Sequence, residues 1–373
     1  MPPRTNAYVA RNIFLIATEE SGDRLGASLM KVLRQRLGGA VRFEGVGGQS
    51  MAREGLASLF PIEELSIMGL AAVVKQLPMI LRRIRQTADA VTQASPDILV
   101  IIDSPDFTHR VARRVRARDA SIPIVDYVSP SVWAWRPGRA RAMVSYVGHP
   151  LTEQTGMLRP GVDEQRRRGE QPPVVLVLPG SRRSEINHHM AVFGETLALL
   201  QAEGVPFEPI LPTMPHLQDA VREGVKSWKV EPRVVVGEQE KRAAFRIARA
   251  ALAKSGTVTL ELALAGVPMV TAYKAGAAEA WILRRAIRSS SVILANLVIG
   301  ENVVPEFLQR DCRPDKLAPA LREVLMDSPL RQRQLEAFAK IDAILSTGNQ
   351  PPSARAADIV LAALRKFRRS NAR

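Results

Sequence analysis

The sequence is poor in cysteine. Cys312 is the only cysteine among 373 residues, and the five histidines are scattered rather than spaced as metal ligands. A disulfide framework is therefore excluded, and the Cys/His spacings typical of zinc sites are missing. The sequence thus fits a reducing cytosol and predicts no metal centre.

Long hydrophobic runs are missing as well. No apolar stretch approaches the roughly 20 residues that span a bilayer. The apolar run at 13–17 is too short for the core of a signal peptide and leads directly into Glu19 and Glu20. We therefore expect neither export nor membrane spanning. The chain has 46% hydrophobic and 24% charged residues and no low-complexity tract, and it is long enough for two globular domains.

Acidic residues are in the minority. The 52 Lys and Arg outnumber the 37 Asp and Glu, for a formal net charge of +15. This excess suits nucleic acid, anionic lipid surfaces or phosphorylated substrates, and its sign does not choose among them. The basic residues are dispersed, without interleaved aromatics or a nucleic-acid motif, which argues against a nucleic-acid-binding protein. A solvated basic surface is the plainer interpretation.

Short apolar runs alternate with segments of helical periodicity along the whole chain. This pattern predicts an α/β fold of two doubly wound, Rossmann-like domains with parallel sheets. We expect an N-terminal domain over 1–155, a linker over 156–172, a C-terminal domain over 173–345, and a final helix with a basic tail over 346–373. The linker is predicted from its prolines, glycines and charge run. The expected strands are 12–17, 41–46, 97–102, 122–128, 173–178, 207–211, 233–236, 250–253 and 268–273.

In an open parallel sheet, ligands bind beyond the carboxyl ends of the strands. One such end carries Ser255, Gly256 and Thr257 at the start of a predicted helix, where free N–H groups and the helix dipole attract a phosphate. Glu261 follows one turn later, close enough to accept hydrogen bonds from a ribose. An ordinary capped helix is the plainer alternative for this segment.

A second strand end reads "LPGSRR". Gly180 allows a close backbone approach there, and Arg182 or Arg183 offers a charge-assisted contact to a diphosphate. The segment is not a Walker P-loop, and the segment "GVGGQS" does not match the GxGxxG fingerprint of nicotinamide or flavin enzymes. No Asp-x-Asp motif indicates a metal-held nucleotide.

In the first half, Asp103 directly follows a predicted buried strand, where partial burial can tune a carboxylate for general-base work. Asp106 fits a helix cap better. The segment 65–91 is apolar and edged with arginines, which suits docking on an anionic bilayer, although a helix packed in the core is the safer interpretation.

Taken in order, several segments resemble the lipid-A-disaccharide synthase family, which comprises inverting glycosyltransferases of the GT-B architecture (family 19). The resemblance runs from about residue 13 to the C-terminus. The segments that carry it are "EESGDRLGA", "GVGGQSM", "IMGL", "DSPDF", "YVSPSVWAWR", "VGH", "LPGSR", "SGTVTLELALAGVPMV" and "ANLVIGENVVPEFLQ".

The resemblance implies transfer of 2,3-diacylglucosamine from its UDP derivative to the 6-hydroxyl of 2,3-diacylglucosamine 1-phosphate (lipid X), without a cofactor or metal. The product is the β-1′,6-linked disaccharide 1-phosphate, formed in lipid A biosynthesis of a Gram-negative bacterium. The place implied is the cytoplasmic face of the inner membrane, where the enzyme is peripheral. A homodimer that exchanges C-terminal segments is left open.

Site residues follow from the resemblance position by position. Asp103 resembles the base, and Glu19 the active-site glutamate of the N-terminal domain. The implied UDP and substrate positions are Arg182, Ser255, Gly256, Thr257, Glu261, Asn296 and Gln309. The tryptophan loop, expected on the acceptor side, holds Ser129, Trp133, Trp135 and Arg136. The implied membrane-docking residues are Val73, Val74, Leu77, Ile80, Leu81, Arg82 and Arg83.

The sequence departs from the family pattern at two places. Glu20 stands where alanine is more usual, and a strand and helix are missing between Tyr146 and Gly148. Other GT-B enzymes that use UDP-sugars, such as an epimerase or the peptidoglycan glucosaminyltransferase, are the competing hypothesis, against which the tryptophan loop and "DSPDF" argue.

Overall fold

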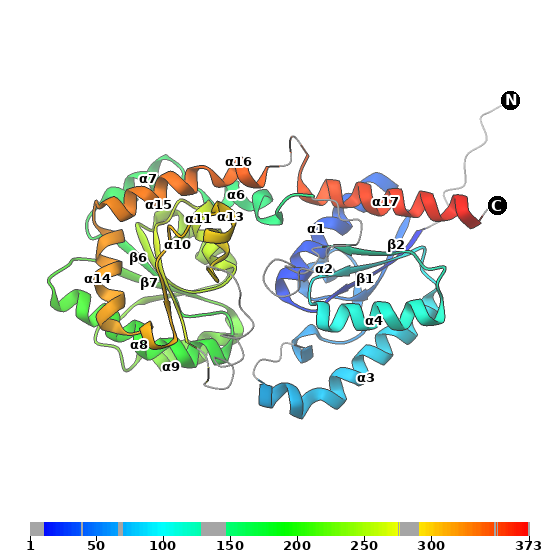
Figure 1. Cartoon of the computed structure of the whole chain (residues 1–373), viewed down its shortest axis with the longest axis horizontal. Helices are drawn as coiled ribbons and strands as arrows, with labels where there is room; N and C mark the ends of the chain where they lie inside the picture. The colour runs from blue at the N-terminus through cyan, green and yellow to red at the C-terminus, as the bar shows by residue number, and fades with distance from the viewer. Residues whose placement is uncertain are drawn as a thin grey trace. The chain divides into compact units, whose positions relative to one another are not determined.

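The computed structural model describes residues 11–38, 40–65, 70–127, 147–274, 276, 291–346, 348 and 350–371, without the side chains of 70–75 and 367–371. The chain forms two compact units (Figure 1). Unit 1 comprises Met1–Pro150 together with Thr347–Arg373, and unit 2 comprises Leu151–Ser346. None of the helices in the described part of the chain combines the length and apolarity that crossing a bilayer requires.

Unit 1 is built on a five-stranded parallel sheet in the order β3-β2-β1-β4-β5. The central strands are continuous apolar runs because helices cover both faces of the sheet. The strands are β1 (Arg11–Ala17), β2 (Val41–Val46), β3 (Ala57–Ser58), β4 (Ile98–Ile102) and β5 (Ile124–Tyr127). The helices are α1 (Glu20–Leu37), α2 (Gln49–Arg53), α3 (Leu70–Ala94), α4 (Pro105–Arg118) and α17 (Pro352–Asn371), with a 3-10 turn at Ile62–Leu65.

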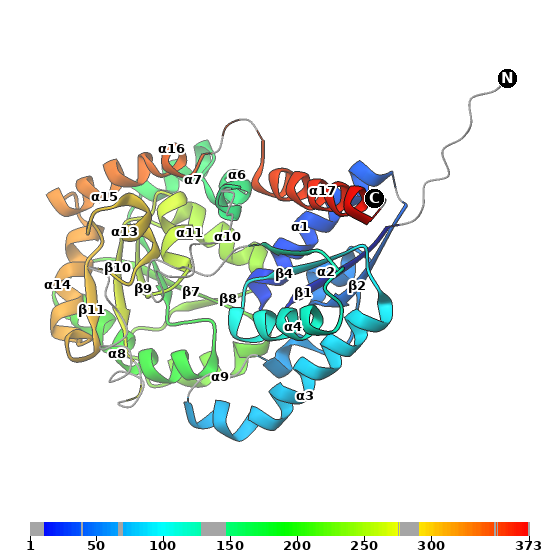
Figure 2. The ribbon, with the colours of Figure 1, turned by 45° about the vertical axis from the view of Figure 1, so that its right-hand side comes forward.

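The final helix, α17, belongs to unit 1. Its buried residues Ala357, Val360 and Leu364 lie in one apolar cluster with Ile13 of β1 and Leu29 of α1. Helices α1 and α17 therefore cover one face of the sheet, and α3 and α4 pack on the other (Figures 1 and 2). An ion pair between Arg36 and Asp358 ties α17 to α1.

Unit 2 is built on a six-stranded parallel sheet in the order β11-β10-β9-β6-β7-β8. Its strands are β6 (Val174–Leu178), β7 (Glu208–Thr213), β8 (Arg233–Val236), β9 (Ala250–Lys254), β10 (Met269–Tyr273) and β11 (Glu306–Leu308). Its helices are α6 (Thr155–Leu158), α7 (Val162–Gly169), α8 (Arg183–Ala202), α9 (Gln218–Val225), α10 (Glu238–Ile247), α11 (Val258–Leu264), α13 (Leu294–Ile299), α14 (Pro314–Leu325), α15 (Pro329–Ala339) and α16 (Ile341–Leu345). Three 3-10 turns lie at Pro150–Gln154, Pro215–Leu217 and Gln309–Asp311.

The segment predicted as a linker, 156–172, is helical and packs on unit 2. Arg168 of α7 is buried, and its guanidinium donates hydrogen bonds of 2.8 to 3.3 Å to backbone carbonyls at the ends of α10 and α11. Those carbonyls have no partner inside their own helices, so the arginine satisfies them. Burial lowers the pKa of Arg168 to about 10. The four acceptors are Phe245, Arg246, Ala265 and Gly266.

Candidate active site

In unit 1, the chain leaves the neighbouring strands β1 and β4 in opposite directions. After β1 it continues to β2 and β3 on one side, and after β4 it continues to β5 on the other. In open parallel sheets, ligands bind beyond the carboxyl ends of the two strands at which the strand order reverses. Ala17 pairs with Ile102 at those ends; Asp103 comes directly after Ile102, and Glu19 is the second residue after Ala17. The topology therefore brings the two predicted catalytic residues to the same point of the sheet.

The backbone at Asp103 is strained. Asp103 and Ser104 have φ values of 53° and 45°, in the left-handed region that residues with a side chain rarely adopt. Oδ1 of Asp103 accepts the N–H of Ser104 at 2.8 Å, and its carbonyl oxygen accepts the hydroxyl of Thr108 at 2.8 Å. Within the described residues Asp103 forms no ion pair. A half-buried carboxylate without a bound cation is suited to accept a proton.

Glu19 is the residue before α1 and is half-buried, whereas Glu20 is exposed. Sequence reasoning missed the role of Asp23 in the same helix. Its buried carboxylate accepts the N–H groups of Gly48, Ser50 and Met51 at 2.7 to 3.0 Å. Hydrogen bonds to Asp23 thus connect the segment "EESGD" to the segment "GVGGQS" and hold the loop after β2 in place.

Asp126 in β5 and His109 in α4 were also missed. Nε2 of His109 lies 2.9 Å from Oδ2 of Asp126. Burial, with a smaller contribution from the negative charge of Asp103, raises the pKa of Asp126 despite its contact with His109. Asp103 therefore has a second carboxyl group within electrostatic range.

In unit 2, strand order reverses between β6 and β9. The chain runs from β6 to β7 and β8 on one side, and from β9 to β10 and β11 on the other. The loops that follow these two strands are the predicted phosphate-binding segments at 178–183 and 254–257. The topology brings them to the same edge, as the rule for open α/β sheets requires.

The first of these loops is built around Glu185. Gly180 has φ +142°, and a Cβ there would lie 2.4 Å from Cβ of Glu185, so only glycine fits. The Glu185 carboxylate accepts the N–H of Ser181 at 2.9 Å and the ammonium of Lys254 at 2.9 Å, and Nη1 of Arg182 lies 3.5 Å away. Burial favours a raised pKa for Glu185, but these interactions with Lys254, Ser181 and Arg182 outweigh it and lower the pKa.

Lys254 and His189 were not predicted from the sequence. The ammonium of Lys254 also lies 5.3 Å from the ring centroid of Tyr273. His189 is buried; its Nδ1 lies 2.7 Å from the carbonyl oxygen of Glu185, and its Nε2 accepts the N–H of Lys274 at 3.0 Å. Burial lowers the pKa of His189 to about 4. A neutral His189 therefore connects the loop after β10 to α8.

The second loop contains Ser255, Gly256 and Thr257. Ser255 is buried, and its N–H donates to the carbonyl of Ala272 at 2.9 Å. The hydroxyl of Thr259 closes the turn on the carbonyl of Gly256 at 2.8 Å. The side chain of Thr257 makes no capping hydrogen bond to α11, which has only seven residues. The much longer α8, which starts at Arg183, offers the stronger helix dipole at this edge.

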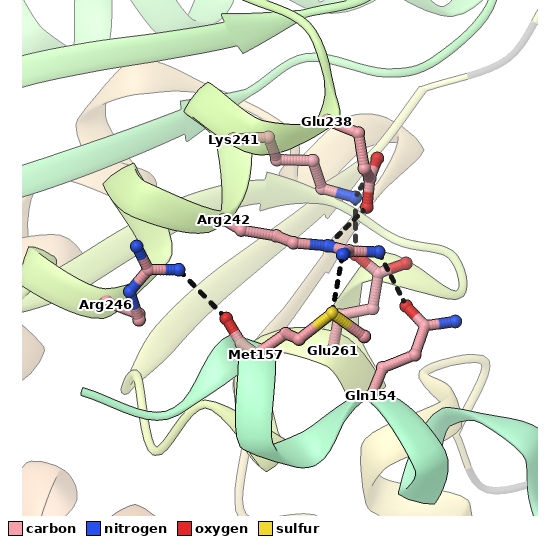
Figure 3. Close-up of polar contacts among 7 residues, drawn as sticks. All are labelled: Gln154, Met157, Glu238, Lys241, Arg242, Arg246 and Glu261. Atoms are coloured by element: carbon pink, nitrogen blue, oxygen red, sulfur yellow. Dashed lines mark hydrogen bonds and ion pairs between the residues drawn. The ribbon is translucent and has the colours of Figure 1, made fainter. Parts of the chain in front are cut away.

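Glu261 lies in the first turn of α11 and is paired with Lys241 of α10, with Nζ and Oε2 2.5 Å apart. The neighbouring Arg242 donates to Glu238 at 3.2 Å and to Gln154 at 3.3 Å (Figure 3). Lys241 therefore holds the predicted ribose-binding carboxylate at the edge that also carries the two loops.

Two predicted substrate residues lie further along the chain. Asn296 is buried, and its carboxamide donates to the carbonyl of Val304 at 3.0 Å and to Glu306 at 3.2 Å while it accepts the N–H of Val304 at 2.9 Å. These contacts hold the segment before β11. Gln309 begins a 3-10 turn after β11 with φ 51°.

The predicted membrane-docking residues have different environments. Leu77 and Arg82 on α3 are exposed, whereas Ile80 and Leu81 pack against the core of unit 1. Arg83 is bound to both carboxylate oxygens of Glu64 at 2.6 to 2.8 Å and lies 4.6 Å from the ring centroid of Phe60. It stabilises unit 1 rather than facing outward. The side chains of Val73 and Val74, and the tryptophan-loop residues Ser129, Trp133, Trp135 and Arg136, lie outside the described residues.

Comparisons with known proteins agree on one family. A family model described as lipid-A-disaccharide synthetase matches residues 13–144 and 142–360. The lipid-A-disaccharide synthase of Nitrobacter hamburgensis is 70% identical over 386 positions, covering 97% of this chain and 98% of the relative. That of Bradyrhizobium diazoefficiens is 70% identical over 384 positions, covering 96% and 98%.

Solved structures show the fold. A calicheamicin glycosyltransferase has a TM-score of 0.56 at 17% identity, covering 95% of this chain and 98% of its own. The protein MurG of Acinetobacter baumannii has a TM-score of 0.54 at 14% identity, covering 94% and 99%. The two units therefore form the two parallel-sheet halves of the GT-B architecture.

The comparisons also bear on the missing strand and helix. The family match breaks into two pieces at 142–144. The alignment with the Nitrobacter relative is longer, at 386 positions, than the chain of 373 residues, so it contains gaps on the side of this chain. Both findings agree with an absent segment near Tyr146 and Gly148.

Proposed function

Because the chain belongs to the lipid-A-disaccharide synthase family, we propose that it transfers 2,3-diacylglucosamine from UDP-2,3-diacylglucosamine to the 6-hydroxyl of 2,3-diacylglucosamine 1-phosphate. The products are the β-1′,6-linked disaccharide 1-phosphate and UDP. The observation that carries this proposal is the 70% identity to synthases over nearly the whole chain, joined to polar loops at both points of strand-order reversal.

In this reaction the carboxylate of Asp103 takes the proton of the acceptor hydroxyl. The freed oxygen attacks the anomeric carbon of the donor on the face opposite UDP, the bond from that carbon to the diphosphate oxygen breaks, and the configuration inverts. The position of Asp103 after β4 and its lack of an ion pair within the described residues support this role. Glu19, at the same edge of the sheet, is proposed to orient the acceptor.

UDP is proposed to bind unit 2 at the loops after β6 and β9. Gly180 lets the backbone approach the diphosphate, and Arg182 and Lys254 offset the charge that grows on the leaving group. The turn at 255–257 supplies hydroxyl and N–H groups, and Glu261 accepts hydrogen bonds from the ribose. Asn296 is proposed to act indirectly, by holding the segment that leads to Gln309.

Both substrates carry acyl chains, so the enzyme is proposed to work as a peripheral protein on the cytoplasmic face of the inner membrane. The exposed Leu77 and Arg82 on α3 support a docking face in unit 1. The helix α17 packs on α1 of its own chain, and homodimer formation stays a prediction.

The test is to incubate the protein with the UDP-linked donor and the monosaccharide 1-phosphate and to follow disaccharide and UDP by mass spectrometry. We expect both products without added metal, and no UDP release when the acceptor is left out. A donor that is epimerised in the absence of acceptor would favour an epimerase instead. The proposal is wrong if neither this chain nor a version with the relatives' segment restored between Tyr146 and Gly148 forms disaccharide.

A further inference from the structure

The ion pair between Lys241 and Glu261 lies almost entirely out of solvent. The two side chains are only 16% and 11% exposed, and Nζ and Oε2 are 2.5 Å apart. The ammonium group also lies 5.4 Å from the ring centroid of Phe245, on the same helix. Taking both charges out of water is costly, and an apolar pair of similar size often stabilises a fold as well or better. The pair therefore calls for an explanation beyond packing.

Among the neighbouring carboxylates, Lys241 pairs with Glu261 rather than with Glu238. Glu238 also lies near the ammonium group, but at 3.9 Å, and its Oε1 accepts a hydrogen bond from Arg242 at 3.2 Å. Arg242 is itself held by the side chains of Gln154, at 3.3 Å, and Met157, at 2.9 Å (Figure 3). Each carboxylate thus has its own cation, and the cluster is electrically balanced.

A balanced cluster has no excess positive charge with which to recruit a phosphate. What it offers is a fixed acceptor: Oε2 of Glu261 is held by Lys241, and within the described residues Oε1 has no hydrogen-bond partner. A carboxylate oxygen has two acceptor sites and can take two neighbouring hydroxyl groups. The chemistry that fits is an uncharged diol, and the place is one turn beyond the loop at 255–257.

We propose that Lys241 is a positioning residue for ribose recognition. It holds the Glu261 carboxylate so that Oε1 accepts the 2′- and 3′-hydroxyls of the nucleotide. This inference rests on the proposed function, because it takes UDP as the ligand of unit 2. It also makes a distinct claim: the preference for a ribonucleotide depends on a lysine that does not itself contact the sugar.

The test is isothermal titration calorimetry with UDP and 2′-deoxy-UDP on the full chain. The wild-type protein is expected to bind UDP about tenfold more tightly, since a hydroxyl bound to a charged acceptor is lost in the deoxy ligand. In Lys241→Met this ratio should fall to about twofold, whereas Lys241→Arg should restore it. The matched control, Lys226→Met, removes an exposed lysine paired with Glu223 and should leave the ratio unchanged.

A merely structural role for Lys241 would lower the melting temperature of Lys241→Met but keep the tenfold ratio, and that result overturns the inference. If Lys241→Met does not fold, Lys241→Gln takes its place under the same criteria. Glu261→Gln should lose the ratio on its own, and adding Lys241→Met should cause no further loss. Disaccharide synthesis by the wild-type chain is measured separately. Its failure would contradict the proposed function. If the enzyme is active and Lys241→Met keeps the wild-type ratio of UDP to 2′-deoxy-UDP affinity, only this inference is contradicted.

Discussion

The two sheet edges use their carboxylates in opposite ways. In unit 2, Glu185 and Glu261 are both nearly buried and each is paired with a lysine. In unit 1, Asp103 has no ion pair within the described residues. The same parallel-sheet architecture thus carries lysine-paired carboxylates at one edge and, among the described residues, a carboxylate outside any ion pair at the other.

Backbone strain differs between the loop after β4 and the loop after β6. After β6 in unit 2, the positive φ falls on Gly180, where it costs little. At the edge of unit 1 it falls on Asp103 and Ser104, whose side chains make it costly. Unit 2 carries the same cost after β11, where Gln309 has φ 51°.

The largest effect is expected from removing the charge of Asp103. Asp103→Asn should lower turnover by about 10³-fold, the usual loss when a general base is removed, and leave the UDP dissociation constant nearly unchanged. Asp106→Asn is the matched control, because Asp106 is an exposed residue in the first turn of α4. Turnover is measured by disaccharide formation and binding by calorimetry. A parallel loss of UDP binding in Asp103→Asn would contradict the base assignment.

A smaller effect is expected from breaking the unit 2 edge at Lys254. Lys254→Met leaves Glu185 buried without its nearer cation, which should lower the free energy of unfolding by about 3 kcal/mol at pH 7. UDP binding should weaken by about tenfold because one charge is lost from the proposed diphosphate site. Urea denaturation and calorimetry measure the two effects.

The pH dependence identifies the cause of the Lys254 effect. In the wild type the lowered pKa of Glu185 stabilises the fold above the ordinary glutamate pKa of 4.5, and this contribution is lost as the pH falls through the lowered value. In Lys254→Met the strongest offset to burial is lost and only Ser181 and Arg182 remain, so the pKa of Glu185 rises and less stability is gained as the pH increases. The difference in the free energy of unfolding between wild type and Lys254→Met should therefore grow from pH 4 to pH 7. When both proteins also carry Glu185→Gln, this difference should not depend on pH. If the difference in the free energy of unfolding between wild type and Lys254→Met does not change with pH, Glu185 is not the cause of the Lys254 effect.

The smallest effect concerns the outer surfaces of the units. Leu77 on α3 and Leu199 on α8 are equally exposed, at 42% and 41%, but only Leu77 belongs to the proposed docking face. Leu77→Ser should weaken sedimentation with vesicles containing anionic phospholipid by about fivefold, through lost apolar insertion. Leu199→Ser should have no effect. Equal losses from both variants would show that unit 1 has no special lipid-binding face.

Alternating apolar runs were sufficient to predict the two sheets. Each of the nine expected strands is present, with ends that differ by up to two residues from the prediction. The strands β3 and β11 were missed because two or three residues carry no periodicity. Candidate residues at strand ends, such as Glu19 and Asp103, could be placed because parallel strands deliver their carboxyl ends to one edge.

The contacts among these residues could not be predicted in the same way. In the sequence, Lys241 and Lys254 cannot be told from ordinary surface lysines. The structure shows that Lys241 of α10 pairs with Glu261 of α11, and that Lys254 of β9 pairs with Glu185 of α8. The linker prediction was wrong for a related reason. The composition of this segment predicted a solvent-exposed loop. Arg168 is nevertheless buried, because it donates hydrogen bonds to the carbonyls of residues 246 and 266, at two helix ends twenty residues apart in the chain.

The return of α17 to unit 1 has a consequence for how the chain is made. A ribosome delivers β1 and α1 first, yet the apolar cluster that covers them needs Ala357 and Val360, which emerge last. Unit 2, which is continuous in sequence, can close its core while the earlier half still lacks one layer. Unit 1 is therefore the last to be completed, and until then the apolar cluster formed by Ile13 of β1 and Leu29 of α1 lacks the cover of α17 and is open to chaperones or to misassociation.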